Sequence, residues 1–291
     1  MKFFAQCGKI RVGLRRLKLS GRTHASNFRI LEKPRKFIEI YRAADARQNG
    51  DYMINYKIEG GNLPVLICYP EAGQTVSTES GSMCWMSPNM RMETNTGGGI
   101  RKFFSKMFSG ERLFLNHFTP EGTGGMVAFA SSFPGSIIPF EVTPGNSLIV
   151  QKSGFLAMEA GMDLSIFFQK KFGAGLFGGE GFIMQKISGC GMAFVEIDGH
   201  AEEIELSAGE SIVVSSGHLA AMTESCRMDV QTVKGFRNVF FGGEGLFLTR
   251  ITGPGRVWLQ SMPVHKLADE LIPFLPTDRD GDSDVTISFG D

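Results

Sequence analysis

The sequence predicts an all-β protein that consists of three pseudo-equivalent repeats followed by a short C-terminal helix. Two observations predict this fold. A Gly-Glu turn followed by an apolar run occurs three times, with the acidic residue at Glu111, Glu180 and Glu244. The apolar runs are short, rich in β-branched residues and bounded by glycine, which is the pattern of strands and turns. Repetition at a nearly constant interval favours a body with pseudo-threefold symmetry.

Two further landmarks precede each Gly-Glu turn in the same order. The first is a turn made of a small residue and glycine. The second is a Ser-Gly pair, found at Ser80-Gly81, Ser153-Gly154 and Ser216-Gly217. Three landmarks in one order, occurring three times, indicate an internal triplication. The copies span residues 63–130, 140–196 and 204–260.

Two local patterns predict individual elements. Asp198-Gly199 separates two strand-like runs, and this dipeptide favours the tight turn of a β-hairpin because both of its positions tolerate positive φ. The run from Val264 to Leu271 has helical periodicity and lies between Pro263 and Pro273. It predicts a short amphipathic helix at the end of the domain.

The charge distribution divides the chain into three regions. Residues 1–52 form a basic leader, with eight basic and no acidic residues among the first thirty. The triplicated β domain covers residues 53–275, and residues 276–291 form an acidic tail. An Arg-rich, acid-free leader is typical of a mitochondrial transit peptide, and it also fits a nucleic-acid-binding tail or an extension outside the domain. We expect the leader to lie outside the folded domain.

The cysteines favour a reducing compartment. The chain contains five, and they form no CxxC pair and no metal-ligand spacing. The longest apolar runs are too short to cross a bilayer as a helix. We therefore expect a cytoplasmic protein, with mitochondrial localisation as the alternative if residues 1–30 are a transit peptide.

The sequence lacks the residue spacings that enzymes and metal sites require. Its five histidines form no HxH or HxxxH pair, and it has no GxSxG motif. We therefore expect a non-enzymatic binding or scaffolding module, without cofactor or metal, that self-associates. An enzyme or small-ligand-binding protein with a cleft between repeats is the alternative. Nucleic-acid binding through the basic leader is a further alternative, although nucleic acid is not the expected partner.

The three repeated glutamates are candidate ligand-binding residues. Glu111, Glu180 and Glu244 occupy one position in all three copies. A pseudo-threefold axis could bring them together around a shared ligand. The competing interpretation is that each carboxylate accepts backbone N–H bonds within its own turn.

The segment 97–108 is a candidate contact for a membrane surface or a protein partner. It begins with three glycines and then mixes cations with aromatic rings, as an interfacial segment does. Burial of the rings in the core is the alternative. The candidate contact residues are Arg101, Lys102, Phe103, Phe104 and Phe108.

Four motifs, at 62–65, 79–83, 97–99 and 133–135, occur together with the repeated Gly-Glu turns. In this set of motifs the chain resembles a family of bacterial proteins related to the mitochondrial "altered inheritance of mitochondria" protein. The resemblance implies a TRAP-like fold, a double-stranded β-helix type named after the tryptophan-RNA-binding attenuation protein. It also implies relatives associated with the mitochondrial inner membrane, and it supplies no catalytic residues. A fold name alone implies neither tryptophan nor RNA binding.

Overall fold

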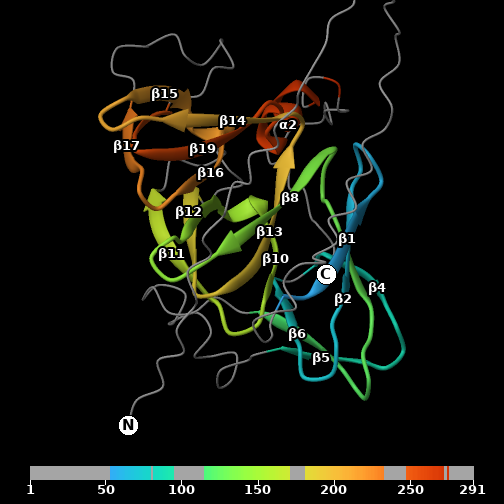
Figure 1. The fold of residues 1–291 in the computed structure, drawn as a ribbon. Coiled ribbons are helices and arrows are strands. Elements are labelled where there is room, and N and C mark those ends of the chain that lie inside the picture. Colours follow the sequence, from blue (N-terminus) through green and yellow to red (C-terminus); the bar gives the residue numbers. More distant parts are fainter. Residues whose placement is uncertain are drawn as a thin grey trace, which may run out of the picture.

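The computed structural model confirms an all-β fold with a short C-terminal helix (Figure 1). It describes residues 53–79, 81–94, 115–170, 181–232 and 247–271 together with Phe274. The helix α2 (Val264–Leu271) has the bounds that the sequence predicts. Pro263 stands immediately before it, where the missing N–H of proline costs no helical hydrogen bond. The predicted leader, residues 1–52, and tail, residues 276–291, lie outside the described residues.

The strands form four antiparallel sheets. Sheet 1 contains, in spatial order, β1 (Asn55–Glu59), β2 (Val65–Tyr69), β7 (Val127–Ala130) and β4 (Met83–Met86). Sheet 2 contains β5 (Met90–Thr94), β6 (Asn116–Pro120), β3 (Val76–Thr78), β10 (Phe155–Glu159), β13 (Gly191–Asp198) and β8 (Gly135–Val142). Sheet 3 contains β11 (Asp163–Lys170), β12 (Phe182–Ser188), β9 (Leu148–Gln151), β16 (Leu219–Thr223), β19 (Gly255–Gln260) and β14 (Ala201–Leu206). Sheet 4 contains β15 (Ser211–Ser215), β18 (Phe247–Thr252) and β17 (Arg227–Thr232).

One pairing scheme recurs in three consecutive segments of six strands. In the first segment, β2-β7-β4 lie in one sheet and β5-β6-β3 in the next. The second segment repeats this order as β8-β13-β10 and β11-β12-β9, and the third repeats it as β14-β19-β16 and β17-β18-β15. A β-bulge also recurs at the same place in β4, β10 and β16, between the first and third residues of each strand. The residues that follow this bulge are Trp85, Ala157 and Ala221.

Antiparallel strand pairs join consecutive segments, and we call these two pairs the internal junctions. In the first, β3 pairs with β10, so that Ser77 lies opposite Met158. In the second, β9 pairs with β16, so that Ile149 lies opposite Met222. The corresponding strands β15 and β4 lie at sheet edges, at opposite ends of the molecule (Figure 1).

Three clusters of buried side chains lie between consecutive sheets. The first draws on sheets 1 and 2, the second on sheets 2 and 3, and the third on sheets 3 and 4. Edge-to-face ring pairs link the sheets, Tyr56 with Phe194 between sheets 1 and 2, and Phe140 with Trp258 between sheets 2 and 3. Sheets 2 and 3 are therefore covered on both faces. This explains why β10 is buried along its whole length, whereas β1, at an outer edge, alternates.

The hairpin predicted at Asp198-Gly199 is wrong. Gly199 does adopt a positive φ of 73°, as the turn signal requires. However, β13 pairs with β8 and β10, while β14 pairs with β19 in the next sheet. Because both edges of β13 are already occupied, the turn carries the chain from sheet 2 to sheet 3 instead of closing a hairpin.

The pseudo-threefold axis and the TRAP-like topology stay predictions. The three Gly-Glu turns that would define the axis lie outside the described residues or at their border. The arrangement that the structure does describe is a set of packed antiparallel sheets, consistent with a β-sandwich architecture.

Candidate functional site

The residues that the sequence singled out for binding lie outside the described residues. They are the ligand candidates Glu111, Glu180 and Glu244 and the membrane or partner candidates Arg101, Lys102, Phe103, Phe104 and Phe108. Their roles stay predictions, and the candidate site has to be sought among the described residues.

A buried carboxylate, Glu159, joins the start of the domain to its interior. It lies on β10, where it accepts hydrogen bonds from the backbone N–H of Ile54 and, at 3.1 Å, from that of Met192. Burial raises the pKa of Glu159, and the two amide hydrogen bonds oppose this effect. The carboxylate is thus used as an acceptor for two amides that would otherwise be buried without a partner.

Two more carboxylates lie at the end of β13. Glu196 accepts hydrogen bonds from the Ser131 hydroxyl at 2.9 Å and from the Ser132 N–H and hydroxyl at 2.7 and 3.1 Å. Asp198 accepts a hydrogen bond at 3.2 Å from the N–H of Val264, the first residue of α2. Burial raises the pKa of both groups, and the negative charge of Glu196 also helps to raise that of Asp198 to about 6. These side chains hold a loop and a helix terminus against sheet 2.

Asp198 makes the stability of the protein depend on pH. Its pKa rises from 3.8 to about 6 on folding, so the stability contributed by the protonated form is complete below the lower value and is lost as the pH rises through about 6. Lowering the pH from about 7.5 to about 5 should therefore stabilise the protein through this group. The gain should be on the order of 1 kcal/mol, because Asp198 is only partly buried and solvent screens its charge. Denaturant unfolding at both pH values measures the gain.

Asp198→Asn is the matched variant for this measurement. It keeps an oxygen that can accept the Val264 N–H but cannot titrate. The variant should gain less stability than the parent protein on acidification, by on the order of 1 kcal/mol. An equal gain in both proteins would contradict the assignment of this pH dependence to Asp198.

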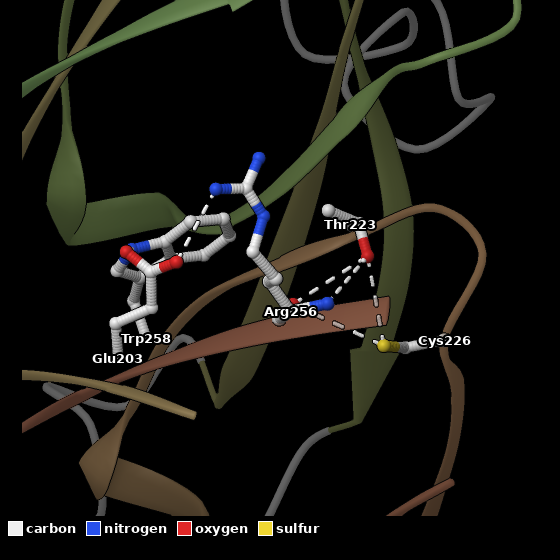
Figure 2. Close-up of polar contacts among 5 residues, drawn as sticks. All are labelled: Glu203, Thr223, Cys226, Arg256 and Trp258. Atoms are coloured by element: carbon white, nitrogen blue, oxygen red, sulfur yellow. Dashed lines mark hydrogen bonds and ion pairs between the residues drawn. The ribbon is translucent and has the colours of Figure 1, made fainter. Parts of the chain in front are cut away.

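A polar surface cluster joins β14 to β19 (Figure 2). The Glu203 carboxylate accepts hydrogen bonds from the Trp258 indole N–H at 3.0 Å and from the Arg256 guanidinium at 3.2 Å. The guanidinium also lies 5.3 Å from the centroid of the Trp258 ring, within the range of a cation–π contact. Arg256 and Glu203 are about half exposed, whereas Trp258 is buried. The cluster stabilises the strand pair and presents one fixed cation at the surface.

A hydroxyl and a thiol hold the neighbouring turn on the other side of the Arg256 backbone (Figure 2). The Thr223 hydroxyl accepts a hydrogen bond from the Arg256 N–H at 3.0 Å. The Cys226 thiol lies 3.6 Å from that hydroxyl and is itself buried. These contacts are structural, since they close the turn between β16 and β17 onto β19.

An open hollow lies where β1 and β2 meet the turn at 123–126. Two of its polar side chains, Asn89 and Ser87, hold that turn. The Asn89 amide donates to the Gly124 carbonyl at 2.6 Å, and the Ser87 hydroxyl accepts from the Met126 N–H at 3.0 Å. The hollow belongs to the first segment, so it is not the cleft between repeats that the enzyme alternative requires.

Two other features are absent from the described residues. Among these residues, no group of three or more His, Cys, Asp or Glu side chains is placed to hold a metal ion. In the same part of the chain, no helix is both long and apolar enough to cross a membrane.

The most unusual surface of the described chain consists of the two open edges at β4 and β15. Trp85 on β4 is 46% exposed, although its equivalents Ala157 and Ala221 are fully buried. Val213 on β15 is 49% exposed. Its equivalent on β9 is Ile149, which lies at the same distance after the turn glycine of its own segment and is fully buried. Neither edge was predicted from the sequence, although the sequence contains one signal of them. A tryptophan stands where the other two copies have alanine.

Comparisons with known proteins agree on the family and the fold. The family model described as "Mitochondrial biogenesis AIM24" matches residues 56–262. An X-ray crystal structure of a protein from Streptococcus pyogenes superposes with a TM-score of 0.65 and 22% sequence identity, covering 76% of this chain and 100% of that one. At this identity the likeness shows the fold alone. No curated protein matches the chain. Since the family model covers well over half of the sequence, the chain belongs to the mitochondrial biogenesis AIM24 family.

Proposed function

We propose that the protein is a non-enzymatic scaffolding module that acts at the surface of a membrane. The observation that carries this proposal is that buried carboxylates and polar side chains of the described residues make structural hydrogen bonds. Glu159, Glu196 and Asp198 accept hydrogen bonds from backbone amides, and Asn89 and Ser87 in the hollow beside β1 close a turn. Two exposed apolar side chains, Trp85 and Val213, lie instead on strands at sheet edges, where macromolecules bind by strand pairing.

The family supports a scaffolding role. Its description names a cellular process, mitochondrial biogenesis, and no reaction. The resemblance drawn from the sequence points to relatives associated with the mitochondrial inner membrane. Contact with the membrane is assigned in this proposal to the segment 97–108, whose cations and aromatic rings suit the boundary between headgroups and acyl chains.

Liposome sedimentation tests this proposal. The parent protein should sediment with liposomes that contain anionic lipid. Replacing Phe103 and Phe104 with serine should weaken that binding by about tenfold or more, because two apolar rings no longer enter the interface. The free energy of unfolding should change by less than about 1 kcal/mol, as expected for surface residues.

Phe167→Ser is the matched control. Phe167 lies on β11 and is 43% exposed, so the variant also removes an exposed ring but leaves the segment 97–108 intact. Its liposome binding should equal that of the parent protein. The membrane role would be refuted if the parent protein does not sediment with anionic liposomes. A large loss of stability in the Phe103/Phe104 variant would show instead that these rings belong to the core.

A further inference from the structure

The strands β4 and β15 differ from every other edge strand of the described chain in one respect. The four sheets have eight edge strands, and β5, β11 and β17 are equivalent to one another, as are β8 and β14. The strands β5, β11 and β17 are edges in all three segments, whereas β8 and β14 correspond to β2, which pairs with β1. Among the edge strands, only β4 and β15 have equivalents that pair with each other from one segment to the next, because β10 joins β3 and β16 joins β9 at the internal junctions.

The two edges also lack the usual protection against strand pairing. Natural edge strands are commonly protected by charged side chains or proline. Each of β1, β5, β8, β11, β14 and β17 contains a charged residue, and β8 contains a proline as well. The strands β4 and β15 read MCWM and SIVVS, with neither a charge nor a proline. Their open edges are therefore competent to pair with another strand.

The side chains on these edges are those that a junction would bury. In β9 and β10 every residue is buried, and in β16 all but the last are. In β4 and β15 no residue is fully buried, and Trp85 and Val213 are about half exposed. A junction with a second copy would continue the stack of sheets, so that sheets of the neighbouring copy cover the outer faces of β4 and β15 and remove this apolar surface from water, as neighbouring sheets do for β9 and β10.

We propose that β15 of one copy pairs in antiparallel fashion with β4 of a second copy, so that the protein assembles head to tail. The register follows from the internal junctions. Ile149 lies opposite Met222 at the second junction, so Val213, which corresponds to Ile149, lies opposite Met86, which corresponds to Met222. Trp85 of the second copy then lies opposite Val214. This inference deepens the proposed scaffolding function and rests on it for its biological meaning, although the pairing itself can be tested separately.

Head-to-tail pairing has a consequence that symmetric pairing lacks. The two surfaces differ, so each copy keeps one free edge after it has bound a neighbour. Assembly therefore continues to longer chains or closes into a ring. This is the property that a scaffold of repeated units requires.

Two variants that each block one edge test the proposal. In Val213→Lys the β15 edge carries a charge and the β4 edge is intact, whereas in Trp85→Lys the reverse holds. Light scattering measures the mass of each protein, in the presence of a reductant because Cys84 is exposed. The mass of the parent protein should rise with protein concentration from the 31.9 kDa of one chain. Each variant alone should stay at the mass of one chain. The dissociation constant of its self-association should rise about 100-fold or more, because pairing would bury an unpaired ammonium.

An equimolar mixture of the two variants provides the decisive result. The intact β15 edge of one variant and the intact β4 edge of the other should form a one-to-one dimer and nothing larger. Phe167→Lys places the same charge on β11, an edge with no paired equivalent, and should assemble like the parent protein. Cys84→Lys places a charge on the same edge at an exposed position, and it replaces Trp85→Lys if thermal unfolding shows that Trp85→Lys does not fold.

Three outcomes would overturn the inference. They are a parent protein that stays at the mass of one chain at all concentrations, single variants that still assemble, and a mixture that stays monomeric. Liposome sedimentation reports on the proposed function independently. A monomer that binds anionic liposomes would refute head-to-tail pairing alone, and an assembly that does not bind them would refute the membrane role alone.

Discussion

Replacing Ile149 with lysine should destabilise the folded protein by about 4–5 kcal/mol. Ile149 is fully buried on β9, where it belongs to the core cluster between sheets 3 and 4 and lies opposite Met222 at an internal junction. Lysine at this position either buries an unpaired ammonium or loses its proton, and both carry a large free-energy cost. Unfolding in denaturant, followed by circular dichroism, measures the change in free energy.

The matched substitution Val213→Lys should cost less than about 1 kcal/mol. Val213 occupies the corresponding position on β15 and is 49% exposed, so its lysine keeps its ammonium in water. The contrast between the two variants depends on the different environments of equivalent strands. Equal destabilisation of both would show that the outer face of β15 is covered within the chain.

Much of the fold could be predicted from local sequence signals. The helix α2 begins and ends where periodicity and the flanking prolines predict. The landmarks Ser153-Gly154 and Ser216-Gly217 lie in the short helical turns η2 (Lys152–Gly154) and η4 (Ser216–His218), which occupy equivalent places before β10 and β16. These features are encoded within a few residues, so that pattern reading detects them.

The choice of strand partners could not be predicted in the same way. Asp198-Gly199 encodes a turn but does not encode which strand follows it in space, and the predicted hairpin failed for that reason. The position of Glu159 was equally hidden. From the sequence alone, a glutamate predicts an exposed position, although Glu159 lies in the fully buried strand β10. Its burial is explained only by the two backbone amides that donate hydrogen bonds to its carboxylate.

For the candidate site, the residues predicted from the sequence and the residues that the structure describes do not overlap. The sequence drew attention to conspicuous residues, among them Glu111 and Phe103, that lie outside the described chain. It gave no direct sign of the edges at β4 and β15, because an open edge is defined by the absence of a neighbour and strand pairing is decided in three dimensions. Two sequence features carry part of that information: the contrast of Trp85 with its alanine equivalents, and the absence of charge and proline from β4 and β15.

Amide hydrogen exchange should separate the two kinds of edge by a large factor. In β9 both edges are paired, with β12 and with β16, so its amides should exchange only through global or near-global unfolding. In β15 one edge is paired with β18 and the other is open. In dilute protein, the β15 amides that point away from β18 should exchange about a thousandfold faster than the amides of β9.

The concentration dependence of this exchange tests most directly whether β15 and β4 are unpaired counterparts of the internal junctions. On going from dilute to concentrated protein, the outward amides of β15 should become protected while those of β9 stay unchanged, and Trp85→Lys should abolish the added protection. The account would be contradicted if the β15 amides exchanged at one rate at every concentration, or if the amides of β9 exchanged as fast as those of β15.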